Sequence, residues 1–184
     1  LTSFKLQRLQ QDRALCEQAL KTSDLDYVTV PDSTPQPGCP VENAVRVSGS
    51  GVRFNGAFLA TCPLAAAYAM FERHGLQPAA QRIFGQPVAR IDHFGSFACR
   101  NIARSNRRSQ HASANALDLA GFRLEDGTRI TVARDWKGDD EKARFLREVK
   151  AAACDAFKIT LSPEYNAAHH DHFHVDMGGF GMCR

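Results

Sequence analysis

The spacing of hydrophobic and polar positions at the start of the chain predicts a helix followed by a connector. Residues 3–20 repeat leucine and phenylalanine among lysine, glutamine and arginine at a helical spacing. Residues 24–40 then contain four prolines and a glycine, a composition that excludes a helix. We therefore expect residues 1–38 to form a helical arm and connector, packed on a main domain of residues 39–184.

The next segment predicts a hairpin and two helices. Residues 45–58 alternate weakly between apolar and polar positions around three glycines, which favours a β-hairpin. Thr61 is a suitable N-cap for a mostly apolar helix over residues 64–74. Gly75 is expected to end that helix, and a second short helix is expected over residues 78–84.

The remaining pattern predicts strands around one long helix. Residues 88–97 suggest a strand, and residues 116–132 suggest two strands joined at the turn of residues 125–127, where Asp-Gly follows an apolar alternation. Residues 139–157 have helical periodicity, and residues 172–177 alternate as a closing strand. This order predicts an α+β fold, with a small and mainly antiparallel sheet flanked by helices.

Composition narrows the class of protein. The chain has 184 residues, of which 43% are hydrophobic and 23% charged, which suits a single globular domain. The net charge of +3 is mildly basic, with four arginines within residues 100–108. We find no nucleic-acid-binding motif and no stretch long enough to span a membrane. We therefore expect no nucleic-acid partner, although the arginine-rich loop keeps such binding as a weaker alternative.

The cysteines indicate a compartment. Six cysteines lie at wide intervals without a CxxC motif, so a thiolate zinc site is not expected. An even count at such spacing favours up to three disulfides and an oxidising compartment, whereas six free thiols would indicate the cytosol. Sequence alone leaves the pairing open, as it does the oligomeric state. We expect a periplasmic or cell-envelope protein whose targeting segment has been removed.

Five of the seven histidines fall in two segments that could share a metal ion, residues 109–118 and 169–176. A catalytic zinc ion takes about three histidine or carboxylate ligands and leaves one position for water. Between His111 and Asp118 a strand would span roughly 23 Å and a helix about 10 Å. Both spans are too long for one ion, so the chain must turn between these residues, through a run of small side chains.

These segments resemble a known signature. Ser-x-His-x6-Asp over residues 109–118, followed by acid-x-x-His over residues 171–174, is similar to the pattern of zinc D-Ala-D-Ala carboxypeptidases and murein endopeptidases. Those enzymes share a fold with the metal-binding domain of hedgehog proteins. Residues 39–184, including the segments 93–102 and 171–176, resemble more specifically the bacterial extensin-like C-terminal domain.

The resemblance implies a zinc centre ligated by His111, Asp118 and His174. Asp171 stands where the peptidases have a catalytic glutamate and is expected to act as the general base that takes the proton of the attacking water. His172 could donate a hydrogen bond to the developing oxyanion. Two departures are present. The acid is an aspartate, one methylene shorter than glutamate, and Ala114 replaces the glycine of the family.

Further residues have expected roles around this centre. Arg100 lies near the position of an arginine that contacts substrate in the peptidases, and Ser109 also matches their pattern. Asp176 is expected to support a histidine of the site, and Trp136 to anchor packing. His169 and His170 are expected to be solvated loop residues.

Two functions are compatible with these residues. The first is a zinc-dependent peptidoglycan hydrolase, either an endopeptidase or a carboxypeptidase, that cuts stem-peptide or crosslink bonds. The alternative is a catalytically silent zinc module that binds a wall polymer or a protein partner. An open metal position near Asp171 would favour the enzyme, and a fourth ligand, most plausibly His172, would favour the silent module.

Overall fold

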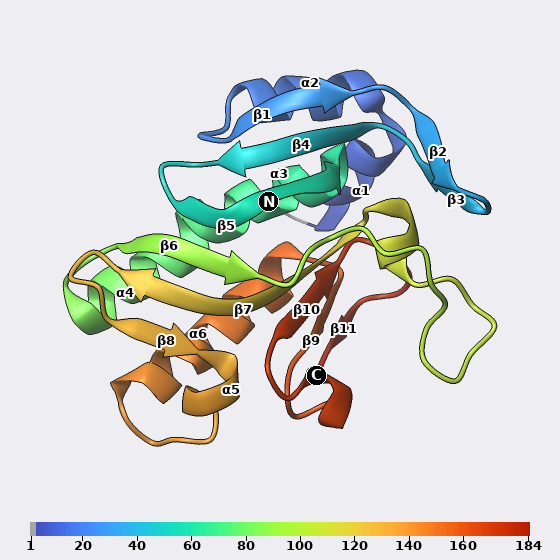
Figure 1. The fold of residues 1–184 in the computed structure, drawn as a ribbon. Coiled ribbons are helices and arrows are strands. Elements are labelled where there is room, and N and C mark those ends of the chain that lie inside the picture. The colour runs from blue at the N-terminus through green and yellow to red at the C-terminus, as the bar shows by residue number, and fades with distance from the viewer. Residues whose placement is uncertain (1–2) are drawn as a thin grey trace.

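The computed structural model describes residues 3–184, which build one mixed β-sheet with helices packed on it (Figure 1). The strands of this sheet are β1 (Asp26–Val30), β4 (Ala44–Gly49), β5 (Arg53–Thr61), β6 (Val88–His93), β7 (Ala116–Leu124), β8 (Arg129–Thr131), β9 (Ile159–Leu161), β10 (Phe173–Asp176) and β11 (Met182–Cys183). A separate two-stranded sheet pairs β2 (Ser33–Gln36) with β3 (Cys39–Val41).

The nine strands are ordered β1-β4-β5-β6-β7-β10-β9-β11, with β8 paired to β7. Among the strands described, β5 and β6 run parallel, as do β9 and β11, and the other pairs are antiparallel. The predicted α+β class is therefore confirmed. The sheet is larger than expected because the connector contributes β1 and the C-terminal segment contributes β9 and β11, whose short strands lack a clear alternation.

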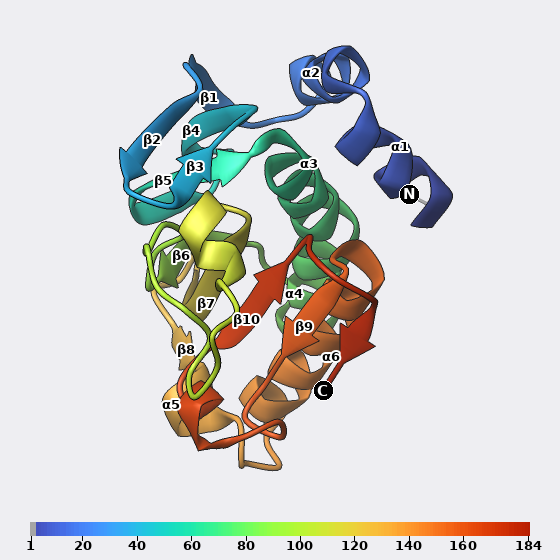
Figure 2. The same cartoon turned by 90° about the vertical axis from the view of Figure 1, so that its right-hand side faces the viewer.

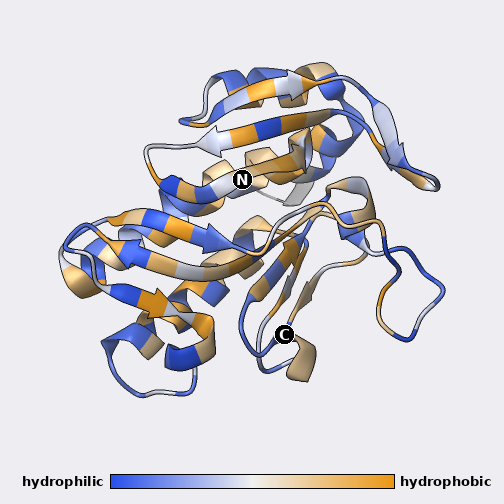
Figure 3. Ribbon diagram, in the orientation of Figure 1, coloured by the Kyte–Doolittle hydropathy of each residue, from blue (hydrophilic) through white to orange (hydrophobic). Residues whose placement is uncertain are grey.

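Helices cover one face of the sheet (Figure 2). They are α3 (Cys62–Phe71), the π-helix η1 (Glu72–Leu76), α4 (Gln77–Phe84) and α6 (Glu141–Ala156), with the short α5 (Val132–Asp135) beside β8. The side chains of Tyr68, Phe71 and Phe145 are fully buried in this layer. The helix α3 is apolar on all sides (Figure 3), as expected for a helix enclosed between the sheet and other helices.

The local predictions for the strands were mostly confirmed. The expected hairpins are β4–β5 and β7–β8, the expected long helix is α6, and the closing strand is β10. Thr61 caps α3 by accepting the backbone N–H of Leu64 at 3.4 Å. The strand expected over residues 88–97 ends at His93, since Gly95 adopts a φ of 102° and turns the chain away.

The N-terminal helix is interrupted. The structure has α1 (Ser3–Gln11) and α2 (Arg13–Lys21), where one helix over residues 3–20 was expected. Asp12 separates them, because its side chain accepts the N–H of Leu15 and caps α2. After α2, the chain enters the main sheet as β1, which pairs with β4.

The prediction that Gly75 ends a helix is wrong. The backbone continues through η1 into α4, and it is Gly85, with a φ of 67°, that caps α4. The absence of a side chain at Gly75 serves packing instead, since a Cβ there would lie 2.4 Å from the Cβ of Ala152 on α6. This glycine therefore allows two helices to approach closely.

Replacing Gly75 with alanine is expected to destabilise the fold by about 2 kcal/mol, because the added methyl group overlaps Ala152 in a packed layer. Urea unfolding of the purified variant measures this loss. The double variant Gly75→Ala, Ala152→Gly should recover much of it. Gly56→Ala is the matched control, since a Cβ at Gly56 meets nothing within 4 Å. An unchanged unfolding midpoint for Gly75→Ala would contradict the packing argument.

Three disulfides connect distant elements: Cys16–Cys62, Cys39–Cys99 and Cys154–Cys183. They join α2 to α3, β3 to the segment that follows β6, and α6 to β11. This set is consistent with an oxidising compartment outside the cytoplasm. Within residues 3–184, the structure contains no helix with the length and apolar character needed to cross a membrane.

Candidate metal centre

His111 is positioned by a tight turn of the chain. It lies in the 3-10 helix η2 (Gln110–Ser113), which Ser109 caps by accepting the N–H of His111. Ala114 then adopts the left-handed conformation, with a φ of 55°. The related peptidases have a glycine where this chain has Ala114. The left-handed conformation explains that glycine, because most side chains are disfavoured in it. The turn delivers the chain directly into β7, as the small residues had suggested.

Asp118 and His174 face each other on neighbouring strands. They are direct partners in the antiparallel pair of β7 and β10. Their neighbours Leu117, Leu119 and Val175 point into the hydrophobic core, so Asp118 and His174 lie on the opposite face of the sheet. In Figure 2 this is the face that carries η2, away from α3, α4 and α6.

The three predicted ligands converge. His111 Nε2 lies 3.2 Å from Asp118 Oδ1 and 3.1 Å from His174 Nδ1, and the last two atoms are 3.1 Å apart. Two atoms bound tetrahedrally to one zinc ion at its usual bond lengths are ~3.3 Å apart. Within the described part of the chain, no fourth side chain joins this set, whose donor atoms all lie within 4.8 Å of one another.

The hydrogen bonds behind the ligands indicate that a cation fits between them. His111 Nδ1 lies 3.0 Å from the carbonyl oxygen of Ser96, and His174 Nε2 lies 2.7 Å from Asp176 Oδ2. Both outer nitrogens therefore donate, which leaves lone pairs on the two inner nitrogens of neutral imidazoles. Together with the Asp118 carboxylate, three electron-rich atoms meet, so this group can hold a divalent metal ion.

A proton is the alternative cation. Burial lowers the pKa of His174, but hydrogen bonds to Asp118 and Asp176 outweigh burial and raise that pKa to about 9. For Asp118, burial raises the pKa, but hydrogen bonds from His111 and His174 hold it well below its usual range. In the metal-free protein the site is therefore an ionised carboxylate beside a protonated His174.

Metal binding is consequently expected to release about one proton near pH 7, because the ion displaces the proton of His174. Below a pH of about 9, apparent zinc affinity should fall as pH falls. Calorimetric titration with zinc in two buffers of different ionisation enthalpy measures the released proton. The Asp176→Asn variant should release less, since it removes a carboxylate that raises this pKa. Equal heats in both buffers would contradict this assignment.

Asp171 and His172 form a pair beside the metal centre. His172 Nδ1 lies 2.8 Å from Asp171 Oδ1, while His172 Nε2 lies 3.6 Å from Asp118 Oδ1. The carboxylate accepts the Nδ1 proton, so the Nε2 atom carries the free lone pair on the side of the metal ligands. The structure thus places His172 between Asp171 and the ligand set.

Further aromatic and imidazole rings form a row of contacts that begins at His172. The His172 ring contacts Phe94 and His169, with centroids 5.9 and 5.2 Å away, and His169 contacts Tyr165 at 5.5 Å. His169, expected to be solvated, is half-buried. Its burial, with the charges of His172 and His174, lowers its pKa to about 4. The charge of Arg100 contributes to the same shift.

The remaining predicted residues have different surroundings. Ser109 is buried, and its hydroxyl accepts the His111 N–H, so its expected substrate contact stays a prediction. Asp176 supports His174, as expected, and Trp136 packs edge-on against Phe173. The loop of residues 100–108 is exposed and mostly hydrophilic (Figure 3).

Sequence reasoning missed Ser96 and Asn115. The Ser96 contribution is a backbone carbonyl, which every residue carries, so no residue type could have marked it. Asn115 accepts the Thr61 hydroxyl at 2.7 Å and donates to Gln110 at 2.7 Å, which ties the turn after His111 to β5. Asn115 lies between the predicted ligands His111 and Asp118 in the sequence, and this position could have indicated its supporting role.

Comparison with known proteins identifies one family. Neither curated proteins nor solved structures give a significant match to this chain. The family described as extensin-like protein C-terminus matches residues 14–184, which is nearly the whole chain and includes the three converging ligands. The chain therefore belongs to the extensin-like C-terminal family.

Proposed function

We propose that this protein is a zinc-dependent hydrolase that cuts peptide bonds in the stem peptides or crosslinks of bacterial peptidoglycan. The observation that carries the proposal is the convergence of His111, Asp118 and His174 on the sheet face away from the core, with three protein ligands in the set. Three ligands suit a catalytic zinc ion, whereas structural zinc sites usually have four. The three disulfides support a periplasmic or cell-envelope location.

The proposed chemistry uses the residues beside the ligands. A zinc ion held here would supply Lewis-acid chemistry, which activates water and polarises a carbonyl group. His172 would accept the proton of the attacking water at Nε2 and pass it to the leaving amine. Asp171 would hold the His172 ring by accepting its Nδ1 proton and would stabilise the imidazolium that forms. This proposal differs from the expectation that Asp171 is the base, because Asp171 contacts His172 Nδ1 and it is His172 Nε2 that lies on the side of the ligands.

Arg100 is proposed to anchor a substrate carboxylate. Its side chain is exposed, and its charge is among the causes that lower the pKa of His169. Stem peptides are rich in carboxylates, and a guanidinium can bind such a group bidentately. Replacement of Arg100 should therefore raise KM more than it lowers kcat.

The direct test is digestion of purified peptidoglycan with zinc-loaded protein, followed by mass analysis of the released fragments. Release of single terminal residues would indicate a carboxypeptidase, and release of separated stem peptides an endopeptidase. The absence of release by folded, zinc-loaded protein would favour the silent module, in which His172 would complete the coordination. His172 is near enough to the ligands for this role, because its Nε2 atom lies 3.6 Å from Asp118 Oδ1.

Asp171→Asn is expected to lower kcat by about 100-fold, because the amide no longer stabilises the protonated His172. Zinc affinity should stay within a few-fold, since Asp171 is outside the ligand set. Asp139→Asn, at an exposed position before α6, is the matched control and should leave both quantities unchanged. Unchanged turnover in Asp171→Asn would refute the paired role of Asp171 and His172.

A further inference from the structure

A second buried carboxyl group lies on the helical side of the sheet. Glu72, the first residue of η1, is only 7% exposed. Its Oε2 atom accepts hydrogen bonds from the hydroxyls of Ser50 at 2.6 Å and Tyr68 at 2.5 Å. Among the side chains that the structure describes, which begin at Gln7, the other oxygen, Oε1, has no hydrogen-bond partner. Half of this carboxyl group is therefore available to another molecule.

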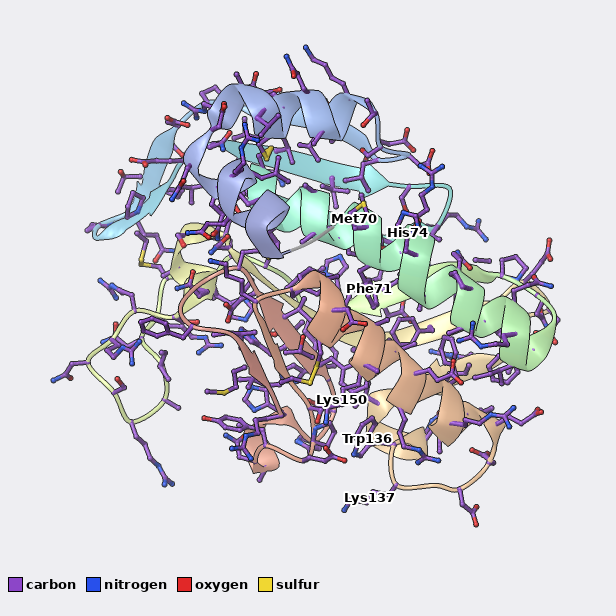
Figure 4. The ribbon with its side chains drawn as sticks, turned by 180° about the vertical axis from the view of Figure 1, so that it is seen from behind. Met70, Phe71, His74, Trp136, Lys137 and Lys150 are labelled. Atoms are coloured by element: carbon purple, nitrogen blue, oxygen red, sulfur yellow. A yellow bond between two sulfur atoms is a disulfide. The ribbon has the colours of Figure 1, made fainter. Side chains whose placement is uncertain are left out.

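Glu72 lines a cavity of about 1080 Å³. The cavity lies between the N-terminal helices, α3 and the turn that joins β4 to β5, and apolar side chains form most of its wall: Leu9, Leu15, Val52, Ala66, Ala69 and Met70. Figure 4 shows Met70 on the part of α3 that faces the N-terminal helices. Polar and charged side chains complete the wall, so the cavity offers both an apolar surface and groups that could orient a small molecule.

The backbone is irregular at the same place. Glu72 opens a π-helical turn between two α-helices, and such turns are rare and occur frequently at functional sites. The turn shifts the residues that follow α3 relative to a regular helix. Glu72 thereby reaches the cavity while Gly75, three residues later, packs against α6.

The charges around the cavity favour a cationic group. Burial raises the pKa of Glu72, and the negative charge of Asp24 on the cavity wall adds to this effect. Among the side chains described from Gln7 onward, the wall carries four carboxyl groups against two guanidinium groups, namely those of Asp24, Asp26, Glu72 and Glu125 against Arg8 and Arg73. An ammonium group between Glu72 and Asp24 would relieve this imbalance, whereas an anion would increase it.

We propose that this cavity binds a small amphipathic amine, with its ammonium group at Glu72 Oε1 and its apolar part against Leu9, Ala69 and Met70. The site lies on the opposite side of the sheet from the metal ligands, so it is independent of the proposed hydrolase activity. It adds a ligand-binding role to the helical layer.

The test uses octylammonium as the probe, with octanol and octanoate as comparators of equal length. Calorimetric titration of the full chain should give saturable binding of one octylammonium, at least about tenfold tighter than octanol, as expected for a charge-assisted hydrogen bond. Octanoate should bind more weakly than octanol. Glu72→Gln keeps the shape of the side chain and should abolish the preference for octylammonium over octanol.

A second variant tests the location. Ala69→Leu fills the cavity without changing its charge and should weaken octylammonium binding at least about tenfold. Ala151→Leu, the same substitution at an exposed position of α6, should bind as the parent does. The proposal is overturned if octylammonium does not saturate, if Glu72→Gln keeps the preference, or if Ala69→Leu binds normally.

Discussion

Replacing His174 with alanine is expected to lower zinc affinity by about a hundredfold to a thousandfold and to abolish hydrolysis of peptidoglycan. Structural zinc sites with four ligands bind with roughly 10–16 kcal/mol, so each ligand contributes about 2.5–4 kcal/mol, which is about two to three orders of magnitude. His174 is also the centre of the hydrogen-bond network, since it contacts Asp118 and Asp176 through its two ring nitrogens. Competition with a chromogenic zinc chelator measures the affinity, and fragment release measures the activity.

The matched control for this variant is His74→Ala. His74 is an exposed residue of η1, and Figure 4 shows it on the rear of the molecule, beside Met70 on the helical layer. This variant should bind zinc and cut as the parent protein does. If His174→Ala retained parental zinc affinity, the ion would be held elsewhere, and the assignment of the metal centre would be wrong.

Removing the disulfide between Cys16 and Cys62 by a double alanine replacement is expected to lower the free energy of unfolding by about 4 kcal/mol. Both cysteines are buried, and their sequence separation is 46 residues, so the crosslink restricts a long segment of the unfolded chain. The loss should loosen α2 from α3 first, because this bond joins the two helices directly. Urea unfolding under non-oxidising conditions measures the change.

The comparison for this prediction is the pair Cys154 and Cys183. Its separation of 29 residues is shorter, so its removal should cost less by about 0.4 kcal/mol from loop length alone, and Cys183 is exposed. A loss below about 1 kcal/mol for the Cys16–Cys62 pair would mean that hydrophobic packing alone holds the N-terminal helices on the body.

Sequence patterns predicted those elements whose periodicity is strong. The hairpin β7–β8 and the helix α6 each combine regular alternation with a clear turn or cap, so local rules were sufficient. Gly75 was misassigned because a glycine can end a helix or allow two helices to touch, and only the tertiary position of Ala152 decides between these roles. The strand β1 was missed because the prolines that follow it led us to interpret residues 24–40 as a connector throughout.

The metal ligands were predictable because their chemistry resides in side chains at a distinctive spacing. His111, Asp118 and His174 meet as the motif implies, and the support from Asp176 follows from its position on the same strand. The pairing of the cysteines and the orientation of Asp171 toward His172 depend on how the whole chain packs, and a single sequence does not encode them in any local pattern.

The position of β10 in the sheet sets the order in which this protein can fold. This strand lies between β7 and β9, third from one edge of the sheet, and its residues 173–176 follow those of both neighbours in the chain. Until they are available, β7 and β9 each lack a neighbour and Asp118 has no histidine opposite it. Pairing between segments so far apart in the sequence is slow compared with local pairing. The metal ligands therefore come together only late in folding, when β10 joins β7.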